Sequence, residues 1–313
     1  MRIAIFGVGG AGGYFGARLA QAGEDVVFIA RGEHLRIIRE QGLRLESIKG
    51  DVLIQPAQAT DDPASVGVVD MVLLGVKAWQ VAEAAQAMRP MIGPETLVVP
   101  LENGVEAPGQ LVAALGTAHV LGGLAVIISF LAGPGHIRHA GTEPFIAFGE
   151  LDNRPSERAE RLRAVFLKAG VNAAIPPDIH VALWEKFVFI VAISGVGAIT
   201  RAPAGAIRAL PETRQMLEQV MRETLLVGQA RGIALTEQAI TKAFAGVDGV
   251  VESGTASMQR DIMAGRPSEL EYQNGAVVRL GQEVGVATPV NALIYHSLLP
   301  QELRARGNLQ FSL

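Results

Sequence analysis

Lys186 stands directly before the most apolar stretch of the chain, and its setting favours acid–base chemistry. The 13 residues that follow it, 187–199, carry no charge. A lysine at the edge of such a helix either extends its amine into water or is held in a cleft, and burial would suit it to donate a proton near neutral pH. Ile190 and Ser194 follow at helical spacing and are predicted to share its face.

A second group of polar residues surrounds a Gly-Arg-Pro break at 265–267. Ser257 opens the stretch before the break, and Glu269 lies just after it. Ser268 and Glu271 have the spacing of a capping box, which is a complete structural explanation for the acidic pair. The spacing alone therefore leaves open whether Glu269 is a catalytic carboxylate or a first-turn acid.

A glycine-rich turn near the start of the chain indicates a nucleotide site. An apolar run at 3–6 meets glycines at positions 7, 9 and 12, and a helical pattern follows. In a strand–turn–helix unit, these glycines permit the turn, let a pyrophosphate approach and allow close helix packing. The free N–H groups at the start of the helix would face the phosphates. The residues predicted to bind the cofactor here are Gly7, Val8, Gly9, Gly10, Ala11 and Gly12.

The end of the second predicted strand, 26–29, favours NADP over NAD. An NAD site usually carries an acid about 20 residues after the glycines, at the ribose hydroxyl. This chain has Arg31 at that place and an acid only at Glu33. A guanidinium binds a 2′-phosphate bidentately. We therefore expect NADPH as the cofactor, with Arg31 at its 2′-phosphate.

Strands and helices alternate through the first half, which is typical of a doubly wound sheet. Apolar strands are expected at 70–76 and 96–100, followed by Lys77 and Asn103. Ligands of such sheets bind at the carboxyl ends of the strands, so both residues are expected to line the site. Glycine-broken runs from 119 to 149 are expected to be strands that finish the sheet.

The second half has an almost wholly helical pattern. The prolines at 176 and 177 mark the boundary, which predicts an α/β dinucleotide-binding domain at 1–177 and an all-α substrate domain at 178–313. A small substrate would bind beside the cofactor. The predicted helices cover 179–200, 211–230, 237–245, 250–264, 269–284 and 290–298.

The totals exclude several classes of protein. A net charge of −4 over 313 residues argues against nucleic acid as a partner. The two most apolar runs, 120–132 and 187–199, are shorter than the ~20 residues that span a bilayer, so no membrane segment is expected. Cysteine is absent, and no metal site is expected. We expect a cytoplasmic enzyme; the sequence does not decide between a monomer and a homodimer.

Taken together, these motifs resemble the ketopantoate reductase family (2-dehydropantoate 2-reductase) over nearly the whole chain. The stretches that carry the resemblance are Gly7–Gly12 with Arg31, Lys77-Ala78-Trp79-Gln80, Asn103-Gly104, Leu183-Trp184-Glu185-Lys186, Ser257–Asp261 and Ser268–Tyr272. The resemblance implies a Rossmann-type domain and a helical domain akin to that of 6-phosphogluconate dehydrogenase. It also implies NADPH-dependent reduction of ketopantoate to (R)-pantoate, a step of pantothenate and coenzyme A biosynthesis.

The resemblance also implies roles for individual residues. Lys186 would be the general acid toward the carbonyl oxygen, with Glu269 as its partner. Ser257 would hold the substrate carboxylate, and Asn103 and Lys77 would lie in the wall of the site.

Two positions depart from the family pattern, which has asparagines four and eight residues after the lysine. This chain has Ile190 and Ser194 there. An unpaired buried hydroxyl costs about 1–3 kcal/mol, so a different, more apolar 2-oxo acid is an alternative substrate. A second alternative is a non-catalytic NADP-binding protein whose helical domain serves an interaction.

Overall fold

The computed structural model describes residues 1–141 and 143–311, which form two compact units. Unit 1 comprises Met1–Glu102 and Glu106–Ile179, and unit 2 comprises Asn103–Val105 and the chain from His180 onward. The short segment at 103–105 thus belongs to the helical unit although it directly follows the last strand of the main sheet.

Unit 1 is built on a parallel sheet with the strand order β5-β2-β1-β6-β7. In chain order these strands are the third, second, first, fourth and fifth of the sheet, which is the Rossmann order. Their apolar runs are buried because helices cover a parallel sheet on its faces. The strands are β1 (Arg2–Phe6), β2 (Asp25–Ile29), β5 (Gln58–Thr60), β6 (Val69–Leu74) and β7 (Ile92–Pro100).

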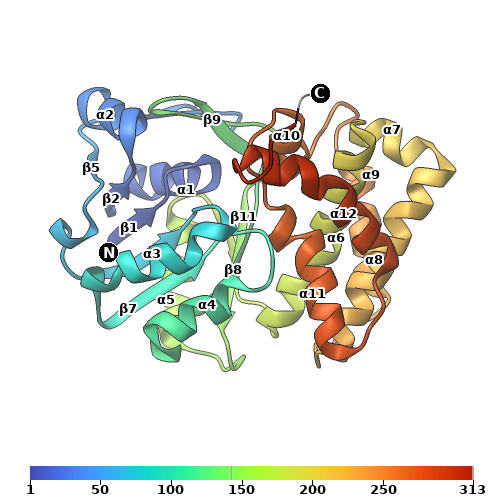
Figure 1. The fold of residues 1–313 in the computed structure, drawn as a ribbon. Coiled ribbons are helices and arrows are strands. Elements are labelled where there is room, and N and C mark those ends of the chain that lie inside the picture. Colours follow the sequence, from blue (N-terminus) through green and yellow to red (C-terminus); the bar gives the residue numbers. More distant parts are fainter. Residues whose placement is uncertain (142, 312–313) are drawn as a thin grey trace. The chain divides into compact units, whose positions relative to one another are not determined.

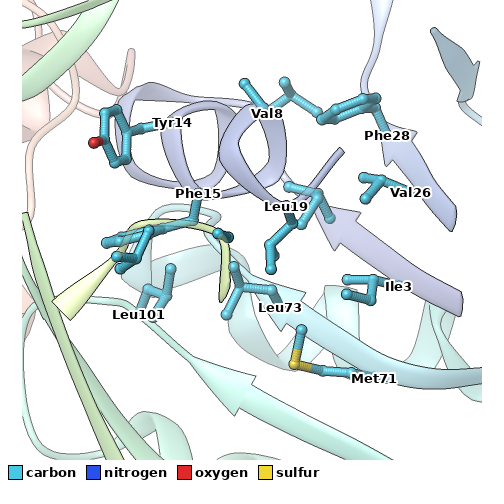
Figure 2. Packing of buried hydrophobic residues seen from close by; sticks show 14 of the residues in the cluster. Ile3, Val8, Tyr14, Phe15, Leu19, Val26, Phe28, Met71, Leu73 and Leu101 are labelled. Carbon is cyan, nitrogen blue, oxygen red and sulfur yellow. The ribbon is translucent and has the colours of Figure 1, made fainter. Parts of the chain in front are cut away.

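Helix α1 (Gly10–Gln21) packs its apolar face on this sheet. Figure 2 shows Phe15 and Leu19 on the side of the helix that faces Leu73 of β6. Each of these side chains is fully buried, and burying one large apolar side chain contributes about 1.5–3 kcal/mol. This packing holds the glycine turn before α1 against the sheet. The other helices of unit 1 are α2 (Gly32–Gln41), α3 (Val81–Ala87), α4 (Ala107–Leu115) and α5 (Glu157–Lys168).

The strands expected to finish the main sheet form two further small sheets instead. β3 (Leu43–Ser47) and β4 (Val52–Ile54) pair antiparallel, and β3 also pairs with β10 (His136–His139), which pairs with β9 (Ser129–Gly133). The third sheet has the order β12-β11-β8. An isolated bridge, Val98 to Val120, links β7 to the residue before β8. The strands of the third sheet are β8 (Leu121–Val126), β11 (Phe145–Glu150) and β12 (Asn172–Ala174).

Unit 2 is built of helices around α6 (Ile179–Thr200), as Figure 1 shows in yellow-green to red. A helix that is apolar on all sides is buried among others, and Phe187, Val188 and Val191 of α6 are indeed fully buried. By length and hydropathy α6 could cross a membrane, but 67% of its most apolar window is buried inside the protein. The other helices are α7 (Ala204–Ala209), α8 (Pro211–Ala230), α9 (Gln238–Gly249), α10 (Ser257–Met263), α11 (Asn274–Val284) and α12 (Pro289–Ala305).

The predicted fold class, a doubly wound sheet followed by an all-α part, is confirmed. Four helix predictions of this part are wrong in extent: α9 continues to Gly249 and α12 to Ala305, and the helices expected at 250–264 and 269–284 begin later than predicted. Residues 250–256 are not helical, and helix α10 begins only at Ser257. The helix expected at 269–284 is a 3-10 turn, η5 (Leu270–Tyr272), followed by α11, because the backbone of Gln273 leaves the helical region with φ −113° and ψ −99°.

Candidate functional site

The glycine turn and Lys77 lie at the point where the strand order of the main sheet reverses. β1 pairs with β2 on one side and with β6 on the other. The glycine turn follows β1, and Lys77 comes three residues after β6. Nucleotides bind at such switch points, outside the carboxyl ends of the strands.

Contacts within the turn explain why two of its glycines are required. Gly7 has φ +98°, and a Cβ there would lie 2.8 Å from the carbonyl of Gly75. At Gly12 a Cβ would lie 2.1 Å from the oxygen of Gly7. A side chain at Gly12 would push the helix away from the turn, and one at Gly7 would strain the backbone and collide with the loop after β6.

The start of α1 offers backbone donors for an anion. Gly9 is the N-cap residue and has no side chain to cap the helix. The first hydrogen bond of the helix is donated by the N–H of Gly13 to the carbonyl of Gly9, at 2.8 Å. The N–H groups of residues 10–12 are therefore first-turn donors that have no acceptor within the helix. This donor set fits a dinucleotide diphosphate.

Arg31 follows β2 and is the N-cap residue of α2. Its guanidinium is 67% exposed and forms an ion pair with Glu83 at 3.1 Å. An exposed pair of this kind is worth at most about 1 kcal/mol, so a phosphate could readily replace the carboxylate. The chain has no acid at the tip of β2, and the basic group there fits a 2′-phosphate.

Lys77 is half-buried beside Trp79. Its Nζ lies 5.8 Å from the centre of the Trp79 ring, and its backbone N–H donates to Gln80. The next N–H back along the chain, that of Val76, donates to the buried carboxylate of Glu102 at 3.1 Å. These contacts hold the loop after β6 at the switch point.

His34 is a residue of the nucleotide half that sequence reasoning missed. Its Nε2 donates to the carbonyl of Val8 at 2.8 Å, and its Nδ1 accepts from the N–H of Gly135 at 2.8 Å. The ring thereby ties the glycine turn to the β9–β10 turn, an arrangement that requires the neutral imidazole. Burial lowers the pKa of His34, although the bond to Val8 opposes this shift. A lone histidine five residues after a strand gave no signal of this role.

Asn103 and Glu269 are brought together within unit 2, although 166 positions separate them. The amide of Asn103 donates to Oε2 of Glu269 at 3.4 Å. A second amide, that of Gln273, reaches the same oxygen at 3.5 Å. The carboxylate is only 5% exposed. Gln273 was not among the predicted residues, since an amide four residues after an acid is a common surface pattern.

The capping box expected at Ser268 and Glu271 does not form. The hydroxyl of Ser268 donates to Glu302 at 2.5 Å, and its N–H donates to the same carboxylate at 3.0 Å. Glu271 instead accepts from the hydroxyl of Tyr295 at 2.6 Å. Burial, together with this bond, raises the pKa of Tyr295 to about 12. The structural explanation for the acidic pair is therefore wrong, because a buried acid on α12 satisfies Ser268.

The remaining predicted residues lie on two helices of unit 2. Lys186, Ile190 and Ser194 follow one another at helical spacing along α6, with Ser194 fully buried. Ser257 is the first residue of α10 and is half-buried. Each is thus a helix residue, and its part in a reaction stays a prediction.

Known proteins match the chain over nearly its whole length. Residues 3–153 match the family model described as "Ketopantoate reductase PanE/ApbA", and residues 178–302 match its C-terminal counterpart. The 2-dehydropantoate 2-reductase of Mesorhizobium japonicum is 31% identical over 92% of this chain and 94% of its own length. An uncharacterized oxidoreductase of Bacillus subtilis, YkpB, is 28% identical over 95% of this chain and 98% of its own length.

A solved structure is also similar throughout. A crystal structure of a PanE/ApbA family ketopantoate reductase from Ralstonia eutropha matches with a TM-score of 0.89 at 31% identity. The match covers 98% of this chain and 100% of that chain.

Proposed function

Because the chain belongs to the ketopantoate reductase family, we propose that it reduces 2-dehydropantoate to (R)-pantoate with NADPH. At the coarser level it is an oxidoreductase of the 2-dehydropantoate 2-reductase type that depends on NAD or NADP. The observation that carries the finer proposal is the buried carboxylate of Glu269, held by the amide of Asn103 from the far side of the sequence. A carboxylate buried with polar partners is typical of a reaction site.

The cofactor would be held by the residues at the switch point of unit 1. The first-turn N–H groups of the 7–12 loop would bind the diphosphate, and Arg31 would bind the 2′-phosphate. Lys77 and Asn103 would line the wall of the site. When bound, NADPH supplies the hydride.

The protein's own task is to manage charge at the carbonyl oxygen. Lys186 would stabilise the negative charge that develops there and would then donate its proton to that oxygen. Glu269 would orient the ammonium, and the hydroxyl of Ser257 would hold the substrate carboxylate. Ser194 and Ile190 would border the remainder of the substrate.

The lysine assignment is tested by Lys186→Ala. General acid catalysis contributes about 10²- to 10⁴-fold, so kcat should fall at least about a hundredfold in steady-state assays with NADPH and 2-dehydropantoate. Lys242→Ala is the matched control, because Lys242 is 59% exposed and pairs with Glu185 on the surface. Turnover of Lys186→Ala within tenfold of wild type would remove this lysine from the mechanism.

A second candidate substrate is a more apolar 2-oxo acid. Ile190 favours it, because an isoleucine side chain neither donates nor accepts a hydrogen bond. Comparing kcat/KM across a panel of 2-oxo acids with NADPH separates the two substrates.

We also propose that the protein works in the cytoplasm, in the synthesis of pantothenate and coenzyme A. The test uses a bacterial strain that lacks its own ketopantoate reductase and therefore requires pantothenate. Expression of this chain should allow that strain to grow without added pantothenate.

A further inference from the structure

Three fully buried side chains of unit 2 each keep an oxygen without a hydrogen-bond partner among residues 1–141 and 143–311. The oxygens are Oγ of Ser194, Oε1 of Gln273 and Oδ1 of Asn274. The elements that carry them meet, because a Cβ at Gly195 would lie 2.7 Å from the amide of Asn274. Unsatisfied buried oxygens reduce the stability of the fold, and their clustering is characteristic of functional sites.

Gln273 is the one of the three that bonds to the proposed reaction centre. Its Nε2 donates to Oε2 of Glu269, which also accepts from Asn103. Because a carboxylate accepts only, this bond decides which end of the amide is the NH₂ group. Oε1 of Gln273 is consequently left as an acceptor beside Glu269.

The other two oxygens are less suited to select a ligand. Asn274 is bound into the interior, since its Nδ2 donates to Asn291, which in turn donates to Glu223. The side chain of Ser194 is two bonds long and is fixed to α6. Gln273 has the longer side chain, and it is itself the residue whose irregular backbone separates η5 from α11.

We infer that Gln273 determines specificity by accepting a hydrogen bond from a hydroxyl group of the substrate. The inference rests on the proposed function and narrows it. The substrate class becomes a 2-oxo acid with a hydroxyl near its carbonyl, in spite of the apolar Ile190. Gln273 thereby supplies an amide that neither Ile190 nor Ser194 provides.

Two substrates that differ by one hydroxyl test this role. The first is 2-dehydropantoate (4-hydroxy-3,3-dimethyl-2-oxobutanoate), and the second is its analogue without the hydroxyl, 3,3-dimethyl-2-oxobutanoate. The value of kcat/KM is measured for each with NADPH. A site built to bond a hydroxyl rejects the analogue that lacks it, so the wild type should prefer the first by about ten- to a hundredfold.

Gln273→Met keeps the length of the side chain and removes the amide. We expect the preference to fall to within about threefold of unity, because kcat/KM should fall much further on the hydroxylated substrate than on the analogue. Gln273→Asn, which retains an amide, should recover part of the preference. Gln282→Met is the control, since Gln282 is exposed on α11, the helix that Gln273 precedes.

The melting temperature separates this role from a structural one. Gln273→Met removes an unsatisfied buried oxygen and also the long bond to Glu269, which still accepts from Asn103, so its melting temperature should stay close to that of the wild type. A lower melting temperature with an equal loss on both substrates would overturn the inference, as would an unchanged preference. If the wild type prefers the analogue without the hydroxyl, the role of Gln273 is refuted, but the protein is still a 2-oxo acid reductase. If the wild type reduces neither acid, both the role of Gln273 and the proposed function are refuted.

Discussion

The buried carboxylate of Glu302 should be a main support of the segment that carries Glu269. It is 4% exposed as a side chain and accepts from the N–H and hydroxyl of Ser268 and from Nε of Arg306 at 2.6 Å. In Glu302→Gln, the new NH₂ group must face one of these donors, and Arg306 loses its ion pair with Glu302 while its bond to the carbonyl of Ser268 at 2.9 Å remains. Breaking a buried ion pair in this way costs about 3–5 kcal/mol.

The measurement is urea unfolding followed by tryptophan fluorescence. The chain has two tryptophans, and Trp184 belongs to the core of unit 2. A Trp79→Phe background therefore makes the signal report on the unit that contains Glu302. The slope m should be unchanged while the midpoint falls.

Glu271→Gln is the matched control for this prediction. The side chain of Glu271 is 45% exposed, and a glutamine can still accept from Tyr295. Its cost should stay below about 1 kcal/mol. The reasoning would be refuted if Glu302→Gln lowered the free energy of unfolding by less than about 1 kcal/mol, or if Glu271→Gln lowered it by more than Glu302→Gln does. Either result would favour the capping box of Ser268 and Glu271 as the main support of this segment.

Three further predictions concern unit 1. Under the proposed function Arg31 would bind the 2′-phosphate, so Arg31→Ala should raise KM for NADPH about ten- to a hundredfold and leave KM for NADH within about twofold. Arg36→Ala is the control and should change neither KM, because Arg36 is exposed on helix α2, which Arg31 precedes. Gly12→Ala should lower the free energy of unfolding by about 1–3 kcal/mol or more, because its Cβ would lie 2.1 Å from the carbonyl oxygen of Gly7. Gly109→Ala is the control: a Cβ at Gly109 meets nothing within 4 Å, so this change should be neutral or stabilising. Because the pKa of His34 is lowered in the fold, its neutral form stabilises the fold above pH 6.5, and this contribution is lost as the pH falls through the native pKa. Between pH 7 and pH 5, the free energy of unfolding should therefore fall more in the wild type than in His34→Gln. Equal losses in the two proteins would contradict the role of this ring.

The local features of the chain could be predicted from the sequence alone. The strand before the glycine turn and the helix after it depend mainly on neighbours within a dozen residues, and the glycine spacing marks the turn between them, although Gly7 also meets the distant Gly75 in the fold. The 22 residues of α6 were predicted at their observed bounds, because an uninterrupted apolar run leaves few alternatives. The order of strands and helices likewise indicated a doubly wound sheet, and the motifs indicated the family, which the comparisons confirm.

The partners of the polar side chains depended on the tertiary structure. Ser268 had a plausible partner three residues away, yet it bonds to Glu302, 34 positions later. The contact of Asn103 with Glu269 joins residues that no local pattern connects. His34 acquires its contacts only because the fold brings the carbonyl of Val8 and the distant N–H of Gly135 to its ring.

The physical reason is the range of the forces involved. Periodicity and backbone conformation act between near neighbours, so the sequence determined the nucleotide loop, the helices and the family. A hydrogen bond needs a partner within about 3.5 Å in a defined direction, and only the packed chain decides which polar groups meet. That Asn103 lies against Glu269 was decided by the tertiary structure.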